Sequence, residues 1–360
     1  MPDTVFVFGA GFSAPADMPI ARNLMREVLR RPDEKAVRAT YRSLFGHSHD
    51  GVEEMADIPM EDVFTVLDRA IRGREAIRGF AREQIESARA ELVRGILALF
   101  AERLAAFDER PYRAFFEEVV ARRLGDGSPA AQSADPFSII SLNWDTIPDW
   151  LVDRYGTQRG VAVDYACYDD AAPGSPHHVP SLMLKAKGCF NVKLLKLHGS
   201  VNWLLCPSCS RLYSIRGGDE GPPRLDAEER VECAHCEGVE TEALIVTPTL
   251  LKDLRPVHLA SVWHQAMVDL QEARRIVFVG YSFPTSDFEL RYVLLKALTG
   301  RQRPAVRVVL YPPDEKCDPR RKVLRELKEE RYRSFFGRDV EFAFVDAETF
   351  LERADLAWEW

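Results

Sequence analysis

The chain has 360 residues, 46% of them hydrophobic and 29% charged, and a formal net charge of −8. This length and composition are those of a globular protein with one large domain or two small ones. The acidic balance disfavours a broad nucleic-acid surface, which needs a local excess of lysine and arginine. No apolar run approaches the roughly 18–20 residues needed to span a bilayer.

Two further features bear on location. The opening MPDTVFVFGAG has an apolar run of strand length with no basic segment before it, so we expect no secretory signal. The seven cysteines include two CxxC pairs, which in an intracellular protein indicate a metal site rather than disulfides. Both features favour a cytoplasmic protein.

Strands and helices are expected to alternate along the chain, beginning with a buried strand at Thr4–Phe8 and a helix from about Ile20. Apolar residues spaced three and four apart predict helices over 60–123, whereas 155–190 reads as irregular. Further strands are expected at 137–142, 192–197, 243–247, 275–279, 305–311 and 340–345, with helices near 287–298, over 320–338 and at the C-terminal end. This alternation indicates a mostly parallel sheet whose ligands bind at the carboxyl ends of its strands.

The first expected strand ends in the loop Gly9-Ala10-Gly11-Phe12-Ser13. Glycines at this point let the backbone approach a diphosphate, and the N–H groups that begin a following helix bind the anion. The alternative is a glycine turn required only by chain geometry. An ordinary dehydrogenase is disfavoured, because GxGxxG and an acidic residue after a second strand are both missing.

Polar residues follow two other expected strands. Asn143 and Asp145 come after the strand at 137–142, and His198 lies between the strand at 192–197 and a glycine. An asparagine amide can orient a water, and an aspartate can accept hydrogen bonds or complement a positive charge. The alternatives are an Asx turn or helix cap for Asn143 and Asp145, and a purely structural role for His198.

The two CxxC pairs carry the most specific signal. They are separated by 23 residues, a spacing that favours a tetrahedral four-thiolate zinc site. Four free thiols or a redox pair are the alternatives, but redox chemistry needs only one pair. A zinc ion with four thiolate ligands has no open position and is therefore structural. The expected ligands are Cys206, Cys209, Cys233 and Cys236.

Taken in order, these motifs resemble the sirtuin family over about residues 4–312. The family's opening GAG-x-S and GIPDFR motifs align with GAGFSAPADMPIAR, which runs from Gly9 to Arg22. Its glutamine-asparagine-x-aspartate motif is similar to Leu142-Asn143-Trp144-Asp145. Its strand-HG segment before the zinc ligands is similar to LLKLHGSVNWLLCPSC, and a later glycine-x-serine is similar to Gly280-Tyr281-Ser282.

The resemblance implies a Rossmann-like, mostly parallel α/β sheet that binds NAD at its carboxyl edge. It implies a single catalytic domain over 1–360, with a helical insertion at 50–130 and a small four-cysteine zinc module at 200–243. The implied catalytic residues are Asn143, which positions a water, and His198, which acts as a base at the ribose. The implied NAD-binding residues are Gly9, Ala10, Gly11, Phe12, Ser13, Arg22, Asp145, Gly280 and Ser282.

Departures from the family favour one branch of it. The family's aspartate-phenylalanine pair, which shields the reactive ribosyl centre from water, is replaced by Ile20-Ala21, and its glutamine by Leu142. The segment that pairs with an acyl-lysine peptide has no equivalent in IVTPTLLKD. These features look like the divergent sirtuin-like NAD hydrolases of bacterial anti-phage systems.

The expected activity is therefore hydrolysis of NAD to nicotinamide and ADP-ribose. Because a free NAD hydrolase is toxic to its host, we expect gating by self-assembly or by an operon-encoded partner such as a HerA-type ATPase. Two alternatives stay open. One is an NAD-dependent protein lysine deacylase, and the other is a non-catalytic subunit that binds NAD or ADP-ribose.

Overall fold

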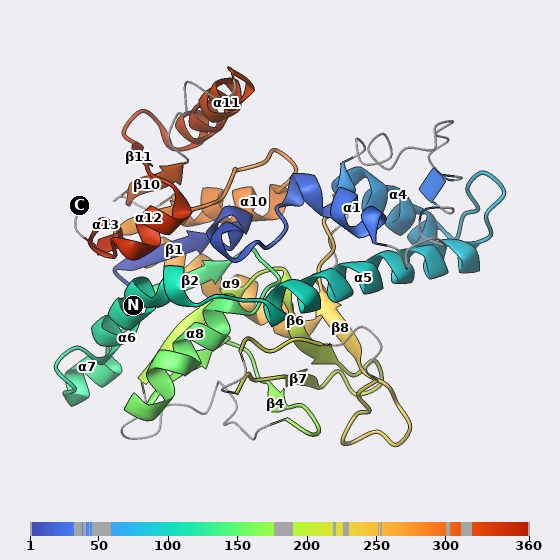
Figure 1. Ribbon diagram of the computed structural model, residues 1–360, viewed down its shortest axis with the longest axis horizontal. Coiled ribbons are helices and arrows are strands. Elements are labelled where there is room, and N and C mark those ends of the chain that lie inside the picture. Colours follow the sequence, from blue (N-terminus) through green and yellow to red (C-terminus); the bar gives the residue numbers. More distant parts are fainter. Residues whose placement is uncertain are drawn as a thin grey trace.

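The computed structural model describes residues 2–31, 38, 41–42, 44, 59–175, 190–218, 221–225, 230–250, 252, 254–299, 303–310 and 319–358. A seven-stranded parallel sheet lies at its centre, in the order β11-β10-β9-β1-β2-β5-β3 (Figure 1). Its strands are β1 (Thr4–Phe8), β2 (Phe137–Ser141), β3 (Val161–Asp164), β5 (Phe190–Lys196), β9 (Arg275–Val279), β10 (Ala305–Leu310) and β11 (Glu341–Phe344). The expected α/β class with a mostly parallel sheet is confirmed.

The strand order indicates where along the carboxyl edge of the sheet a ligand would bind. From β1, the chain adds β2 and β5 on one side of the sheet and later β9, β10 and β11 on the other. The winding direction therefore reverses between β1 and β9, which pair in parallel with Phe8 opposite Val279. In doubly wound sheets, ligands bind in the crevice that opens outside the carboxyl ends of the strands at such a reversal.

Helices cover both faces of the sheet (Figure 1). One layer contains α6 (Arg113–Leu124), α8 (Ile147–Gly156) and α12 (Ala347–Glu352), and the other contains α9 (Val257–Glu272) and α10 (Phe288–Ala297). The core beneath the first layer is aromatic, with Phe6 and Phe8 of β1 in edge contact with Phe115 of α6. The fully buried strands have near-continuous apolar sequences, as expected when both faces of a parallel sheet are covered.

A group of three helices lies beyond the carboxyl edge of the sheet. It consists of α1 (Ala21–Arg30), α4 (Met60–Gly73) and α5 (Arg82–Ala105), which pack on one another. The helices expected over 60–123 are thus confirmed, although α6 belongs to the layer on the sheet. The remaining helices are α7 (Pro129–Ser133), α11 (Pro319–Phe336) and α13 (Asp355–Trp358). No helix in the described ranges combines the length and apolarity needed to cross a membrane.

A second, four-stranded sheet carries the cysteines. It has the order β4-β7-β6-β8, from β4 (Asp170–Ala171), β7 (Leu212–Ser214), β6 (Gly199–Leu205) and β8 (Glu242–Ile245). The strand expected at 243–247 lies in this small sheet, antiparallel to β6, rather than in the main sheet. β3, β4, β6 and β7 were not predicted from the sequence. β3, β4 and β7 have only four, two and three residues and carry little periodic signal, whereas β6 has seven.

Candidate active site

A cavity of about 660 Å³ runs along the carboxyl edge of the main sheet. Its wall extends from His198, which lies after β5, to Val345, which lies after β11. Five strand spacings separate β5 from β11, so the edge spans roughly 24 Å at about 4.8 Å per spacing. The opposite wall comes from α1, α4 and α5 through Leu24, Met60 and Phe100.

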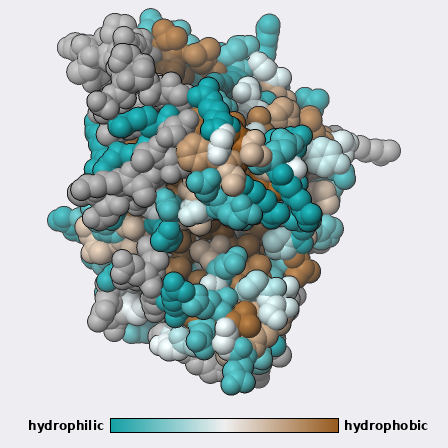
Figure 2. Space-filling view, turned by 90° about the vertical axis from the view of Figure 1, so that its right-hand side faces the viewer, coloured by the Kyte–Doolittle hydropathy of each residue, from teal (hydrophilic) through white to brown (hydrophobic). Residues whose placement is uncertain are grey.

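Figure 2 shows the molecule from the right-hand side of Figure 1, with a recess near the middle of this face. Apolar residues are visible inside the recess and hydrophilic residues surround it. A volume of about 660 Å³ with a mostly apolar wall and a few converging polar groups is typical of small-molecule sites.

The glycine loop is shaped by its contact with the end of β9. Gly9 N donates to Val279 O at 3.0 Å, and Gly11 N donates to Gly280 O at 2.9 Å. A Cβ on Gly9 would lie 2.6 Å from Tyr281 Cα, and one on Gly11 would lie 2.8 Å from Gly280 Cα. The geometric explanation for these glycines, which the sequence left open, therefore accounts for both of them.

The helix expected from about Ile20 is confirmed as α1, but it does not begin directly behind the glycines. Two short 3₁₀ turns, η1 (Ala10–Phe12) and η2 (Ala14–Ala16), follow instead, and α1 begins only at Ala21. Ala10 and Gly11 of η1 line the cavity. The amides of Gly11 and Phe12 donate to Gly280 O and Gly9 O, whereas the amide of Ala10 donates to no residue that the structure describes. Any anion contact in this loop would come from these turns rather than from the N-terminus of a long helix.

Ser13, Asn143 and Asp145 form one hydrogen-bonded group, which we call the amide cluster. Ser13 Oγ donates to Asp145 Oδ2 at 2.7 Å, and Asn143 Nδ2 donates to Gly9 O at 2.9 Å and to Ser13 Oγ at 3.0 Å. The hydroxyl proton of Ser13 and the amide N–H groups of Asn143 are thus occupied. Asn143 Oδ1 accepts no hydrogen bond from any residue that the structure describes, so it can accept one from a ligand or water.

Asp145 also fills the capping role that the sequence left open. Its Oδ1 accepts a hydrogen bond from Ile147 N at 3.2 Å, which forms an Asx turn at the start of α8. Lys196, fully buried at the end of β5, donates to the carbonyl of Asp145 and lies 3.3 Å from Asp149 Oδ2. Burial raises the pKa of Asp145, and Lys196 and the Ser13 hydrogen bond offset only part of that rise.

His198, Lys252 and Asp287 form a second group, which we call the charged cluster. His198 Nδ1 lies 3.1 Å from Leu142 O, and since a carbonyl only accepts, Nδ1 carries the proton. Its Nε2 is then a lone-pair acceptor, and Lys252 Nζ lies 3.4 Å from it. Burial and the Lys252 charge lower the pKa of His198, so the ring is neutral near pH 7.

Carboxylates hold the lysine of this cluster. Lys252 donates to Asp287 Oδ1, and its Nζ lies 3.1 Å from Glu289 Oε2. Tyr281 Oη donates to Asp287 Oδ2 at 2.7 Å. Lys252, Asp287 and Tyr281 were not predicted as site residues from the sequence. The only signal available was positional: Asp287 begins an expected helix and Lys252 follows an expected strand.

The other expected site residues divide into three sets. The cavity wall includes Gly9, Ala10, Gly11, Ile20, Ala21, Leu142, Gly280 and Ser282. Phe12 does not line the cavity. Its ring is fully buried and stacks on the ring of Phe8, with 3.9 Å between the ring centroids, so its side chain cannot contact a ligand there. Arg22 belongs to α1, but its side chain lies outside the described residues.

The segment 246–250 joins the small sheet to the three-helix group. Arg89 of α5 donates to Asp68 Oδ1 at 2.6 Å and to Thr247 Oγ1 at 3.1 Å. Leu250 N donates to Thr65 Oγ1 of α4 at 2.9 Å. This cavity wall is therefore held to α4 and α5 through both side-chain and backbone groups, and no local sequence pattern predicts these contacts.

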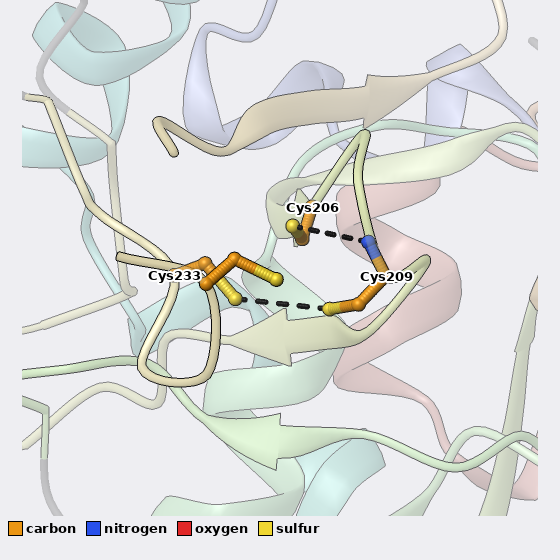
Figure 3. Close-up of side chains that lie close together, drawn as sticks. Cys206, Cys209 and Cys233 are labelled. Atoms are coloured by element: carbon orange, nitrogen blue, oxygen red, sulfur yellow. Dashed lines mark hydrogen bonds between the residues drawn. The ribbon is translucent and has the colours of Figure 1, made fainter. Parts of the chain in front are cut away.

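The four cysteines converge at one end of the small sheet. Their Sγ atoms all lie within 4.8 Å of one another, and Cys209 Sγ and Cys233 Sγ are 3.8 Å apart (Figure 3). Tetrahedral bonds of about 2.3 Å to a zinc-like ion place thiolates about 3.8 Å apart. Cys209 N lies 3.5 Å from Cys206 Sγ, as in the backbone N–H contacts that favour thiolates. The set can hold a metal ion, and none of its members lines the cavity.

The chain matches no protein-family model, and no curated protein is similar to it in sequence. A solved Sir2 homologue mutant in complex with 2′-O-acetyl ADP-ribose is 15% identical at a TM-score of 0.47, covering 98% of this chain and 90% of that one. A Sir2 homologue–NAD complex is 14% identical at a TM-score of 0.44, covering 98% of this chain and 88% of that one. At these values the likeness carries no information on activity.

Proposed function

We propose that the chain is a sirtuin-like enzyme that hydrolyses NAD to nicotinamide and ADP-ribose. The observation that carries the proposal is the cavity at the reversal between β1 and β9, with the amide cluster and a neutral His198 on its wall. Doubly wound sheets bind dinucleotides at such a reversal. The edge of roughly 24 Å has room for an extended dinucleotide rather than a single nucleotide.

In this proposal Ala10 contacts the diphosphate through its amide, whereas Gly9 and Gly11 lie against it through their Cα atoms, because their amides already donate to Val279 and Gly280. Gly280 and Ser282 lie near the adenosine half. Ser13 supports Asn143 instead of donating to the diphosphate, because its proton is already donated to Asp145. Phe12 contributes no direct contact, because its ring is buried and its amide donates to Gly9 O at 2.8 Å. Arg22 is retained as a proposed NAD contact from the sequence.

The reaction breaks the bond between the nicotinamide nitrogen and C1′ of the ribose, and nicotinamide leaves as a neutral molecule. A water oxygen forms the new bond to C1′. Asn143 Oδ1 accepts a hydrogen bond from this water, and His198 Nε2 accepts its proton and passes it to solvent. One water is consumed, and ADP-ribose, nicotinamide and one proton are produced.

Two features of the wall support hydrolysis over deacylation. Ile20 and Ala21 line the cavity, and the small Ala21 leaves room for water. The backbone N–H of Leu250 is bonded to Thr65, so it is not available to pair with an extended acyl-lysine peptide. The helices α4 and α5 therefore stand where a peptide would have to approach the 246–250 segment.

The four cysteines fit zinc by ligand type and spacing, and we propose Zn²⁺ with Cys206, Cys209, Cys233 and Cys236 as ligands. Bound there, zinc would stabilise the small sheet and take no part in the reaction, because four thiolates leave no open position. The proposed organisation is one catalytic domain over 1–360, with a helical insertion at 50–130 and a zinc module at 200–243.

Incubating the purified protein with NAD and measuring nicotinamide release by chromatography tests the proposal. Asn143→Ala and His198→Ala are each expected to lower the rate by about 100-fold or more, because each removes a group at the reacting centre. His264→Ala, at an exposed position on α9, is the matched control and should leave the rate unchanged.

The same assay separates the alternatives. Release that depends on an acyl-lysine peptide and yields an acetylated ADP-ribose identifies a deacylase. Binding of NAD by calorimetry without turnover under any condition identifies a non-catalytic subunit. A rate unaffected by either Asn143→Ala or His198→Ala would falsify the assignment of these residues.

We further propose that the enzyme is a cytoplasmic anti-phage effector that depletes NAD and is gated by self-assembly or by a partner such as a HerA-type ATPase. Phe288, Tyr292 and Leu295 support a protein contact, because they form one exposed apolar stripe along α10. Turnover measured over a range of protein concentrations tests gating by self-assembly. A rate per molecule that is independent of concentration argues against it.

A further inference from the structure

Lys252 occupies an unusual position for a lysine. Its side chain is 6% exposed, yet it lines the cavity and directs its ammonium toward a histidine rather than only toward carboxylates. Its Nζ lies 3.4 Å from His198 Nε2 and 3.1 Å from Glu289 Oε2, and it donates to Asp287. A lysine that only neutralised the two carboxylates would not need to contact the imidazole.

We propose that Lys252 is a positioning residue that keeps His198 neutral and in the Nδ1–H tautomer, so that Nε2 is ready to accept a proton. This inference rests on the proposed function, in which His198 acts as the base. Asp287 and Glu289 hold the ammonium in place at the N-terminal end of α10. Leu142 O holds the other side of the ring by accepting from Nδ1.

The charges around His198 determine whether its pKa rises or falls when Lys252 is replaced. Lys252 faces the ring from the segment before α9, Asp287 and Glu289 face it from the start of α10, and the uncharged Trp263 of α9 lies with its ring centroid 6.2 Å away. Burial and Lys252 lower the pKa of His198, whereas the two carboxylates raise it. Without Lys252, two carboxylates remain beside the imidazole, and protonation becomes easier.

The protonation state of His198 determines the pH range in which the reaction runs. Protonation of Nε2 removes the lone pair that accepts the proton from water, so the acid limb of kcat/KM reports the pKa of His198 in the free enzyme. Lys252 extends activity to lower pH by delaying this protonation. A substrate hydroxyl or water that approaches Nε2 can take the place of the Lys252 contact, since Asp287 and Glu289 continue to hold the ammonium.

The kinetic experiment compares pH profiles of kcat/KM for NAD. Lys252→Met is expected to move the acid limb upward by about one to two pH units. Lys252→Arg, which keeps the charge, should restore the wild-type limb. Lys296→Met is the matched control, because Lys296 is an exposed lysine of α10 that lies over the ring of Tyr292. A Lys252→Met profile that falls at every pH without moving its limb overturns the proposal.

A second measurement does not require turnover or the variant to be stable. Histidine ring nitrogens labelled with ¹⁵N report the tautomer and the pKa of His198 directly in the wild-type protein. The proposal expects an Nδ1–H tautomer and a pKa below the usual value of about 6.5. An Nε2–H tautomer or a pKa at or above that value overturns it. If NAD is not cleaved at all, the proposed function fails, while this titration still tests whether His198 is in the neutral Nδ1–H state that the proposal requires.

Discussion

The amide cluster and the charged cluster flank the same cavity, and each contains a buried aspartate whose pKa has moved in the opposite direction. Asp145 is 2% exposed and Asp287 is 6% exposed. Burial raises the pKa of Asp145, and its neighbours offset only part of the rise. Burial acts on Asp287 in the same way, but its pKa is lowered by the charges of His198 and Lys252 and by the hydrogen bond from Tyr281. His198 is charged in the acid range where Asp287 titrates. The number of charged donors, not the depth of burial, therefore separates the two sites.

The clusters also differ in what holds them. The amide cluster is supported from inside the main sheet, where Lys196 at the end of β5 binds the carbonyl of Asp145. The charged cluster is connected to the small sheet, because β6 begins directly after His198 and ends one residue before Cys206. The first is held by the main sheet, and the second depends on the module that carries the proposed zinc site. Variants that remove one support or the other should therefore affect the two clusters differently.

The largest effect is expected from loss of the proposed zinc site. Cys206→Ala removes one ligand, and structural zinc sites contribute about 10–16 kcal/mol of apparent binding free energy that is coupled to folding. Hydrogen exchange should lose protection in β6 and β7, NAD cleavage should fall by about 100-fold or more because His198 loses its support, and β1 and β2 should remain protected.

A matched cysteine provides the control for this variant. Cys167 is buried but lies outside the four-cysteine set, so Cys167→Ala should leave metal content and exchange in β6 unchanged. If Cys206→Ala removed protection from β1 and β2 as well as from β6, the two clusters would share one support. That outcome would contradict the separate supports inferred for them.

The second prediction breaks the support of the amide cluster. Lys196→Met leaves the carboxylate of Asp149 buried without its cation, which is expected to cost about 3–5 kcal/mol in the free energy of unfolding. Urea denaturation measures this loss. Lys196→Met combined with Asp149→Asn should recover part of it, whereas Lys296→Met on the surface should change stability by less than about 0.5 kcal/mol. No recovery in the double variant would contradict the buried-charge explanation.

The sequence predicted the main sheet well because its strands are continuous apolar runs. It also placed the ends of β1, β2 and β5, so Ser13, Asn143, Asp145 and His198 were expected at one edge, and the structure brings them there. The four cysteines converge as their spacing indicated. These successes share one cause, since each signal is local in sequence.

What the sequence did not show depends on long-range packing. Lys252 reaches His198 across 54 positions, and Arg89 reaches Thr247 across 158, so no local pattern marks either contact. Phe12 was expected near NAD because it lies in the glycine loop, but the aromatic core beneath β1 takes its ring. Residue type could not distinguish a loop side chain that faces a ligand from one that fills the core.

The smallest predicted effects test the opposite pKa shifts directly. Because the pKa of Asp287 is lowered on folding, its stabilisation is present above the unfolded pKa and is lost as pH falls through the folded value. Asp287→Asn should therefore cost about 1–3 kcal/mol at pH 7 and less near pH 3, below the unfolded pKa of about 3.9. The pKa of Asp145 is raised, so its stabilisation is present at low pH and is lost as pH rises through the folded value. Asp145→Asn should accordingly cost more near pH 3 than at pH 7. Urea midpoints at the two pH values give the sign of each slope, and parallel slopes for the two variants would mean that the clusters do not differ electrostatically.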